Sequence, residues 1–499
     1  MSLETQLTSK LPLPESFDAG YLEFNGIFPL DMAENRLRVA VTDTPALEVL
    51  DDLEMSFGAP LELVPVPREV LVDAIRRTFA AAESVVELVR DLDATAGAGG
   101  EPTDGGIADA RDLANQPPVI RFVNLLIREA HDARASDIHL ESRRDGLRVR
   151  FRIDGVLQDM PSPPRGLHAA VVSRVKLLAE LDIAERRVPQ DGRIRVRLEA
   201  RELDLRVSTV PTLYGESVVL RLLDRGGRPV GLDELGMPPA VLDAFRGLVQ
   251  RPHGIVLATG PTGSGKTTTL YAALGLRRAT AEKIITVEDP VEYSLDGVNQ
   301  VPVNGKAGMT FGSALRSLLR QDPDVLMVGE MRDPETARIA VQAAMTGHLV
   351  FSTLHTNDAA GAVARLMDLK VEPYMIAASL EGVLAQRLVR RICAACRERY
   401  EPDPQAAAGL AGQPVCHVTL ERGRGCGACR DTGYHGRTGI FELVVVTDRL
   451  KAEIARTSDT AALRHHAREE GMTTLRADGW RAVRAGITTV EEVVRVVES

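Results

Sequence analysis

The sequence predicts an α/β protein of three or four domains, and three observations support this. Its 499 residues exceed what one hydrophobic core usually serves, because domains average roughly 150 residues. An apolar run at residues 254–258 leads into a glycine-rich loop and then into a stretch without helix breakers up to Gly275, which is the pattern of strand, loop and helix. All five cysteines fall between residues 393 and 429, which is typical of a metal site rather than of a disulfide framework.

The charge and the apolar content of the chain exclude several classes of protein. The net charge is −10 and the pI is about 5.6, so a phosphate backbone repels the chain as a whole, and we expect no specific nucleic-acid partner. No apolar run approaches the roughly 18 residues of a membrane span, and the first residues lack the features of a secretory signal. We therefore expect a cytoplasmic protein that is at most peripheral to a membrane.

Residues 1–92 are predicted to form a small α/β module without catalytic signals. Residues 37–41 have the pattern of a strand. After Pro67, apolar residues recur at helical spacing, namely Val70, Leu71, Ala74, Ile75 and Phe79. Glycine and other breakers dominate residues 94–106, so we predict a flexible linker over 93–112.

Residues 113–231 are predicted to form a second domain, of the α+β class. Residues 119–130 have the apolar spacing of a helix, whereas 146–158 and 193–223 alternate like antiparallel strands. The stretch from 211 to 215 is a predicted turn between two strands. Arg206 and Arg221, on either side of it, are therefore expected to lie near one another. A solvated sheet face is the alternative explanation for both.

Residues 232–390 are predicted to bind a nucleoside triphosphate. The loop has the phosphate-binding pattern of glycine, four residues, glycine, lysine and serine or threonine. Its residues are Gly260, Pro261, Thr262, Gly263, Ser264, Gly265, Lys266 and Thr267, followed by Thr268. Backbone N–H groups at the helix start would face the phosphates, Lys266 would reach the outer phosphates, and the Thr267 hydroxyl would ligate Mg²⁺. The sequence therefore predicts a nucleoside triphosphatase.

Three carboxylates end or follow the apolar strand that begins at Lys283. They are Glu288, Asp289 and Glu292. Glu292 is our candidate for polarising the attacking water, and the other two are rivals because such close neighbours cannot be ranked by sequence. Glu288 and Asp289 are also expected among the residues that bind the nucleotide.

Glu330 and two histidines are predicted to complete the chemistry at the ends of further strands. Glu330 follows the apolar residues 325–328 and lies where open α/β sheets place their ligands. It would hold the water shell of the metal or orient the attacking water. His348 and His355 bracket a buried strand at 349–353, and we expect both to act beside the nucleotide.

Phosphoryl transfer also needs positive charge on the leaving phosphates. Arg316 and Arg320 are candidates within the domain, because residues four apart share one helical face. Arg206 and Arg221 are candidates that could act across a subunit boundary.

Residues 391–440 are predicted to form a zinc-binding element, and 441–499 a helical region. Two C-x₂-C pairs supply four thiolates, which are Cys393, Cys396, Cys426 and Cys429. Four thiolates close the tetrahedral shell of Zn²⁺, so the site is expected to be structural. Cys416 and His417 are the alternative ligands, and we expect Cys416 to be a spare thiol. Basic residues gather nearby, but few aromatic side chains accompany them, so we expect a solvated or partner-facing surface; the residues are Arg387, Arg390, Arg391, Arg397 and Arg399.

From about residue 115 onward the chain resembles the secretion ATPases of type II secretion and type IV pilus systems. The resemblance lies in the phosphate loop and in an ordered series of further segments. These are Ala135–Glu141, Arg150–Gly155, Pro189–Arg193, Val287–Tyr293, Gly329–Asp333, Thr346–His348, Leu354–Asn357 and Gly486–Glu492.

The resemblance implies a RecA-like P-loop ATPase domain preceded by an α+β (PAS-like) domain, with a zinc-binding C-terminal element and a small N-terminal α/β module. It implies a homohexamer that binds ATP between the second and third domains, where Arg206, Arg221, Arg316 and Arg320 complete the site. It also implies that rotations between these domains act on a polytopic inner-membrane platform protein, which would hold the chain peripherally at the inner membrane.

Within this family, the chain length and the single short first module favour the type II secretion branch, which drives pseudopilus assembly and protein export. The close alternative is a pilus assembly (extension) ATPase, whereas pilus-retraction motors lack the four cysteines. In the secretion branch, residues 1–92 would dock on a bitopic inner-membrane component. The glycine and leucine repeats that bind a cyclic dinucleotide in related modules are not evident here.

Two rival functions come from other classes of protein. A DNA-transfer ATPase is disfavoured by the acidic pI. A nucleotide-dependent scaffold without hydrolysis is disfavoured by the intact Lys266, Thr267, Glu292 and Glu330.

Overall fold

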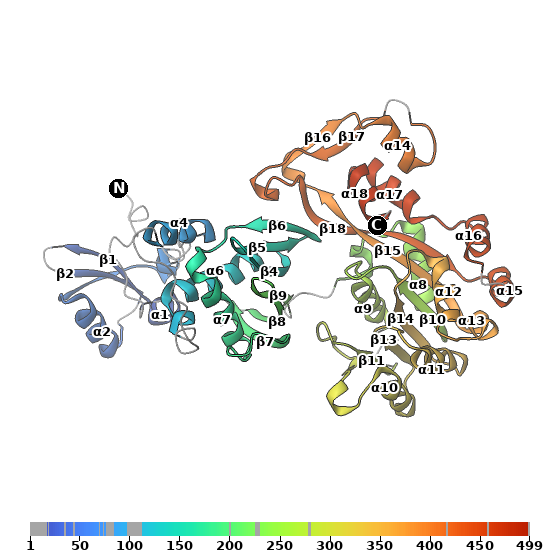
Figure 1. The fold of residues 1–499 in the computed structure, drawn as a ribbon, viewed down its shortest axis with the longest axis horizontal. Coiled ribbons are helices and arrows are strands. Elements are labelled where there is room, and N and C mark those ends of the chain that lie inside the picture. Colours follow the sequence, from blue (N-terminus) through green and yellow to red (C-terminus); the bar gives the residue numbers. More distant parts are fainter. Residues whose placement is uncertain are drawn as a thin grey trace.

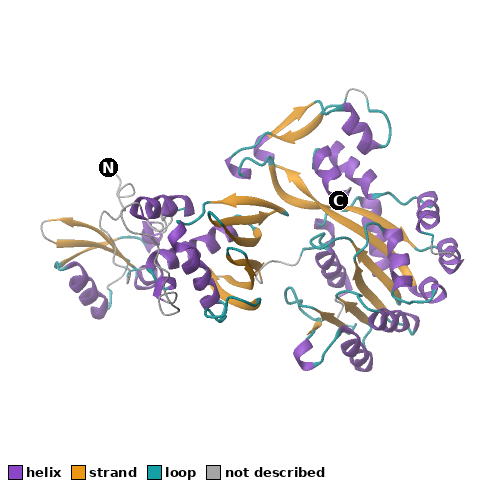
Figure 2. Ribbon diagram, viewed as in Figure 1, coloured by secondary structure: helices purple, strands orange, loops and turns teal. Residues whose placement is uncertain are grey.

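The computed structural model describes residues 17, 19–33, 36–42, 45–68, 70–72, 74–75, 84–96, 112–198, 201–224, 230–277, 281–415, 418–456 and 459–497. These residues form three bodies in a row, which are the first module, the second domain and the large domain that carries the phosphate loop (Figure 1). Each body combines helices with a sheet (Figure 2). Cys416, His417 and most of the predicted linker lie outside the described residues. Within these ranges, no helix is both long and apolar enough to cross a bilayer.

The first module is a three-stranded sheet with helices, as predicted. Strand β1 (Ile27–Ala33) pairs antiparallel with β2 (Arg36–Val41), which pairs parallel with β3 (Leu61–Pro65). Helices α1 (Ala19–Asn25) and α2 (Leu47–Phe57) accompany the sheet. Leu22, Phe28 and Leu53 are fully buried in the core of this module.

Helix α4 (Val85–Ala96) belongs to the second domain, although we predicted the first module to extend to residue 92. Val85, Leu88 and Val89 form an apolar stripe that shares one core with Phe122 of the next helix. The Val85 N–H also donates to Glu129 Oε1 at 2.7 Å. The second domain thus begins before the boundary predicted at 92, and α4 occupies residues 93–96, where we predicted the start of the linker.

The second domain is an antiparallel sheet of six strands in the order β6-β5-β4-β9-β8-β7. The strands are β4 (Ala135–Arg143), β5 (Gly146–Ile153), β6 (Val156–Met160), β7 (Gln190–Leu198), β8 (Arg201–Thr212) and β9 (Gly215–Asp224). Helices α6 (Pro117–Asp132) and α7 (His168–Leu178) pack with α4 on its apolar face. The tight turn after β8 places Arg206 directly opposite Arg221, as the sequence predicted.

The large domain is built on a sheet of seven strands in the order β12-β11-β13-β14-β10-β15-β18. Its strands are β10 (Gly254–Thr259), β11 (Ile284–Glu288), β12 (Asn299–Pro302), β13 (Val325–Val328), β14 (Leu349–Leu354), β15 (Leu380–Ile392) and β18 (Tyr434–Val445). All neighbours pair parallel except β15 and β18. The parallel strands are apolar because helices cover both faces.

Two groups of helices form those covering layers. Helices α8 (Pro239–Val249) and α9 (Lys266–Arg277) contribute to the core on one face. The core on the other face includes α10 (Phe311–Leu318), α11 (Pro334–Met345), α12 (Ala359–Asp368) and α13 (Pro373–Ser379). Four further helices confirm the predicted helical end, namely α15 (Asp448–Arg456), α16 (Thr460–Glu469), α17 (Leu475–Arg484) and α18 (Val490–Val497).

The cysteine element is an excursion between two strands of the main sheet. It contains β16 (Arg397–Tyr400), α14 (Pro404–Ala411) and β17 (Leu420–Gly423). The boundaries predicted at 390 and 440 fall inside β15 and β18, which run unbroken from the ATPase sheet into this element. The element is therefore joined to the main sheet by two strands rather than by a linker.

Candidate active site and metal centre

The phosphate loop leads from the carboxyl end of β10 into α9. Gly260 has a φ of 149°, and a Cβ there would lie 2.6 Å from the Gln386 carbonyl oxygen and 2.7 Å from Ser264 Oγ. Only glycine fits this conformation and this close approach. Ser264 Oγ is buried and has no hydrogen-bond partner among the described residues, so the loop encloses an unsatisfied polar group of the kind that a phosphate oxygen would pair.

Gln386 supports the loop from β15, and the sequence analysis did not identify it. Its Nε2 donates to the Ser264 carbonyl at 2.6 Å, and its Oε1 accepts from Thr269 Oγ1 at 2.8 Å. The side chain is buried. The signal in the sequence is weak, because the polar pair Gln386 and Arg387 follows the apolar residues 383–385 in a strand that also contains Glu381, Arg390 and Arg391.

Arg387 and Arg390 do not belong to the solvated or partner-facing surface that we predicted for the basic residues of this region. Arg387 is buried and donates to three carbonyl oxygens, among them those of Asn357 at 3.0 Å and Val496 at 3.2 Å. Arg390 donates to Glu492 Oε2 at 2.7 Å. Both arginines bond the last helix of the chain to β15. The segment Gly486–Glu492, which carries part of the family resemblance, therefore has a structural role through Glu492.

Lys266 folds back onto its own loop. Its Nζ donates to the carbonyl oxygens of Gly260 at 2.8 Å and of Pro261 at 3.0 Å. Burial lowers the pKa of Lys266 to about 8, although the charge of Glu330 acts in the opposite direction. In the part of the chain that the structure describes, this buried ammonium donates to two neutral carbonyls and to no carboxylate, and the Ser264 hydroxyl of the same loop has no partner; the arrangement fits an anionic phosphate.

We predict that nucleotide binding at pH 8 takes up protons through Lys266. Free Lys266 has a pKa of about 8 and is roughly half protonated at that pH, whereas phosphate charge raises the pKa and favours the ammonium. Calorimetric titration in two buffers of different ionisation enthalpy should show an uptake of up to about half a proton per site. The uptake should vanish near pH 6 and in the Lys266→Ala variant; uptake that persists in that variant would contradict the assignment.

Protein donors in the core hold the Glu288 carboxylate, which argues against both of its predicted roles. The residue is 2% exposed. One carboxylate oxygen accepts from the Tyr271 hydroxyl, and the other accepts from Thr286 Oγ1 and from Gln300 Nε2. These bonds occupy both oxygens in the core, so Glu288 is a structural residue here.

Glu292 and Asp289 meet the arginine pair of the second domain. Burial raises the pKa of Glu292, whereas the charges of Arg206 and Arg221 lower it. A cavity of about 440 Å³ lies between the two domains, and its lining includes Arg206 and Arg221 from one side and Asp289 from the other. The structure therefore brings these predicted residues together within one chain.

Glu330 and His355 lie together at the carboxyl ends of the neighbouring strands β13 and β14. His355 Nε2 is 3.4 Å from Glu330 Oε2. Arg332 Nε is 2.6 Å from the same oxygen. Because Glu330 also acts on the charge of Lys266, this pair belongs to the same end of the sheet as the phosphate loop.

His348, Arg316 and Arg320 do not join this group. His348 precedes β14, so the six-residue strand separates it from the carboxyl edge by about 20 Å, and its ring bonds the Ala343 carbonyl at 2.9 Å. Arg316 pairs with Glu335, and Arg320 donates to the Arg316 carbonyl at 3.0 Å. Within the described part of this chain, neither arginine bonds to the phosphate loop.

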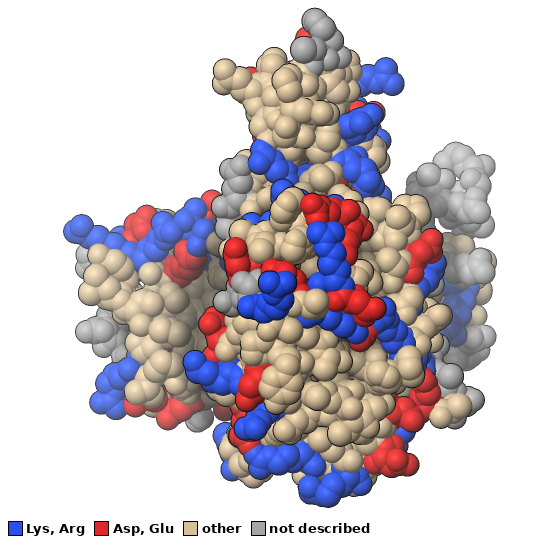
Figure 3. Space-filling model, turned by 90° about the vertical axis from the view of Figure 1, so that its right-hand side faces the viewer, with Lys and Arg blue, Asp and Glu red and all other residues tan. Residues whose placement is uncertain are grey.

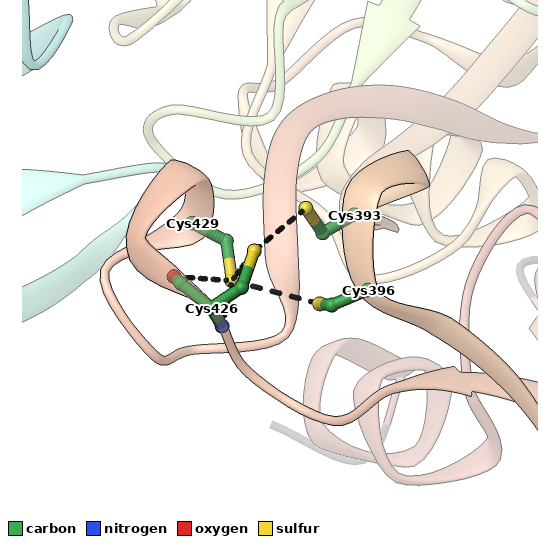
Figure 4. A group of neighbouring side chains, drawn as sticks. All are labelled: Cys393, Cys396, Cys426 and Cys429. Carbon is green, nitrogen blue, oxygen red and sulfur yellow. Dashed lines mark hydrogen bonds between the residues drawn. The ribbon is translucent and has the colours of Figure 1, made fainter.

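The four paired cysteines converge on one point, with their sulfur atoms toward each other (Figure 4). The Sγ atoms of Cys393 and Cys426 are 3.9 Å apart, those of Cys396 and Cys429 are 3.8 Å apart, and those of Cys426 and Cys429 are 3.7 Å apart. A tetrahedron with Zn–S bonds of about 2.3 Å has edges of about 3.8 Å. The four-cysteine set therefore fits zinc.

Backbone N–H groups prepare one thiol of this cluster to bind a cation. Burial raises the pKa of Cys396 to about 12. Burial acts on Cys429 in the same sense, but N–H donors from Cys426 and Gly433, each at 3.2 Å from Sγ, lower its pKa to about 7. Thiolate at Cys429 is thus stabilised near neutral pH.

The strand that leaves the cysteine element also contacts the second domain. The Gly436 N–H donates to Asp154 Oδ2 at 2.8 Å, and Arg437 Nε is 3.5 Å from Asp154 Oδ1. Arg134 bonds the His435 ring in the same region. The β5–β6 turn is thereby joined to the start of β18, so the cysteine element touches both the sheet of the ATPase domain and the second domain.

Comparisons with known proteins agree with this architecture. Residues 112–495 match the family model described as type II/IV secretion system protein, and residues 3–85 match the MshEN domain. Over 491 residues the chain is 46% identical to type II secretion system protein E of Xanthomonas campestris pv. campestris, covering 98% of this chain and 86% of the relative. Over 473 residues it is 44% identical to the type IV pilus assembly ATPase PilB of Myxococcus xanthus, covering 94% and 83%.

Among solved structures, the pilus retraction motor PilT with bound ADP superposes with a TM-score of 0.51 at 27% identity. The match covers 74% of this chain and 95% of PilT. The fold is thus that of a RecA-like secretion ATPase, as predicted. The MshEN match precedes it in the sequence, and the four-cysteine cluster lies in the C-terminal part of the chain.

Proposed function

Because the chain belongs to the type II/IV secretion system protein family, we propose that it is the hexameric ATPase that drives pseudopilus assembly and protein export in type II secretion. It is a secretion ATPase and hydrolyses ATP. The observation that carries the proposal is the cavity between the two domains, where Arg206 and Arg221 face the carboxylates that follow β11. A nucleotide held there would couple hydrolysis to the relative position of both domains.

The loop residues would hold the phosphates, and the carboxylates would act on water. Lys266 and the backbone N–H groups at the start of α9 would donate to the phosphate oxygens. Mg²⁺, when bound, offsets phosphate charge, and the Thr267 hydroxyl together with Glu330 is suited to hold it. Glu292 is suited to accept a proton from the attacking water, because burial raises its pKa. Arg206 and Arg221 would stabilise the charge that develops on the phosphates.

The Glu330→Gln variant tests this catalytic arrangement. We expect ATP binding within about threefold of normal and turnover reduced at least about a hundredfold, because the amide keeps the shape but removes the charge. Fluorescent-nucleotide binding and phosphate release from the hexamer measure the two effects. Glu398→Gln, in the cysteine element, is the control and should leave both unchanged. Normal turnover in Glu330→Gln would contradict the mechanism.

The partners of the chain are a separate part of the proposal. The full chain is expected to bind the cytoplasmic domain of a bitopic inner-membrane secretion component, and a chain that begins at residue 84 is expected not to. A pull-down with both chains checks this. Capture of the component by the shortened chain would remove the docking role from the first module. The platform protein should be captured by both chains.

A pilus assembly ATPase is the second candidate, favoured by the 94% coverage of the match to PilB and by the MshEN match. Since related modules bind a cyclic dinucleotide, calorimetric titration of the full chain with that ligand separates the candidates. Saturable binding, together with capture of a pilus component, would favour pilus assembly. A nucleic-acid motor gains no support from the face in Figure 3, where acidic and basic side chains are interspersed.

A further inference from the structure

One row of charged residues crosses the second domain, and the proposed function uses only part of it. Across the neighbouring strands β5, β4, β9, β8 and β7, the directly opposed residues are Arg152, Asp137, Arg221, Arg206 and Arg193. The row thus contains four arginines and a single carboxylate. Like charges that face each other across strands repel, so Arg206 and Arg221 need a neighbour that keeps both side chains in place.

Asp137 is that neighbour for Arg221. Its side chain is 7% exposed. Its Oδ1 accepts from Arg221 Nε at 2.9 Å, whereas Oδ2 accepts from Ser136 Oγ at 2.8 Å and lies 3.6 Å from Arg152 Nε. Both oxygens therefore have partners, and the carboxylate is held from two sides in a nearly buried position. A group fixed in this way can orient another side chain.

The bond to Asp137 leaves the two terminal Nη groups of Arg221 available for another partner. It involves Nε alone, and within the described residues the two Nη groups donate to no protein acceptor. The Arg221 side chain is 59% exposed, so both Nη groups are accessible. Arg221 lines the cavity between the domains, opposite Asp289. Because guanidinium is planar, fixing Nε fixes the direction of both Nη groups, which can then form two parallel hydrogen bonds to phosphate oxygens.

We propose that Asp137 is a positioning residue for ATP hydrolysis, which acts by holding Arg221 with its Nη groups directed at the nucleotide phosphates. This inference rests on the proposed role of Arg221 in the interdomain site. Without Asp137, Arg221 loses its anchor, and repulsion from Arg206 turns it away from the row. The loss should affect the charge that develops during reaction more than it affects nucleotide binding.

A double-mutant cycle on the full-length hexamer tests the inference. The variants are Asp137→Ala, Arg221→Ala and the combination of both. We expect Asp137→Ala to lower kcat at least about tenfold with KM changed less than about threefold, and Arg221→Ala to lower kcat further. In the Arg221→Ala background, removing Asp137 should change kcat less than about twofold, because its effect passes through Arg221. A merely structural role would lower kcat in both backgrounds alike.

Two further variants complete the experiment. Asp137→Asn keeps an acceptor for Nε and should recover part of the lost kcat, and it remains informative if the alanine variant does not fold. Glu141→Ala breaks the ion pair with Arg150 on the same face of β4 and is the matched control, expected to leave kcat within about twofold of normal.

Each outcome decides between the proposals. Normal turnover in Arg221→Ala would remove the arginine from the proposed mechanism, and the inference with it. Loss of turnover in Arg221→Ala together with normal turnover in Asp137→Ala, or equal losses on removing Asp137 in both backgrounds, would overturn the inference alone. Melting temperature and hexamer content, measured for every variant, confirm that folded hexamers are being compared.

Discussion

The Lys266→Ala variant is expected to lose at least about a hundredfold in ATP turnover while the nucleotide-free protein melts within a few degrees of normal. The loss follows because Lys266 is the cation that the phosphate loop itself supplies, and electrostatic stabilisation of the transferring group is the main task of such a site. Arg387 lies close by but cannot replace it, since carbonyl oxygens already occupy its guanidinium.

The small effect on stability has its own physical reason. Burial lowers the pKa of Lys266 to about 8, so the charged form is held in the folded state at a cost. A folded-state pKa below the unfolded value means that this cost is present at neutral pH and disappears as the pH rises from about 8 toward 10.5. Removing the side chain removes the cost together with two hydrogen bonds to the loop, and the effects offset each other.

Steady-state phosphate release and thermal melting check both statements. Lys306→Ala, an exposed lysine in the same domain, is the control and should leave turnover and melting unchanged. Turnover in Lys266→Ala that stayed within tenfold of normal would show that hydrolysis does not depend on this loop.

Local patterns were sufficient for the elements that shape the site. The strand, loop and helix around Lys266 follow from a short run of residues, and a tight turn fixes the register of Arg206 against Arg221 without reference to the rest of the chain. Glu330 and His355 also followed from strand ends, because the carboxyl ends of parallel strands share one edge. In these cases the decisive neighbours lie close in the sequence.

The wrong predictions depended on neighbours far away in the sequence. The Glu288 carboxylate accepts hydrogen bonds from Tyr271 and Gln300, and no local pattern in the sequence indicates that pairing. His348 failed for a different reason, because a residue that precedes a parallel strand lies at the opposite edge from one that follows it. Gln386 escaped notice because its function depends on β15 lying next to β10, which only the folded sheet determines.

A second large effect is expected from Cys396→Ser, which should abolish stoichiometric zinc binding. The four Sγ atoms have the spacing of one tetrahedral shell, and a hydroxyl is a poor substitute for thiolate in such a site. Elemental analysis of the purified protein should give about one zinc per normal chain and much less than one in the variant. Cys416→Ser is the matched control and should keep the full equivalent; a full equivalent in Cys396→Ser would contradict the ligand set.

The loss of zinc should disturb the contact between domains rather than the main sheet. The Gly433 N–H donates to the Cys429 sulfur, and three residues later the Gly436 N–H donates to Asp154 of the second domain. The ATPase core is covered by helices on both faces, so we expect its sheet to keep its packing without the metal. Hydrogen exchange should therefore rise at residues 393–437 and at the β5–β6 turn, while β10 and β14 keep their protection. Faster exchange throughout the large sheet would instead make zinc a requirement for the whole fold.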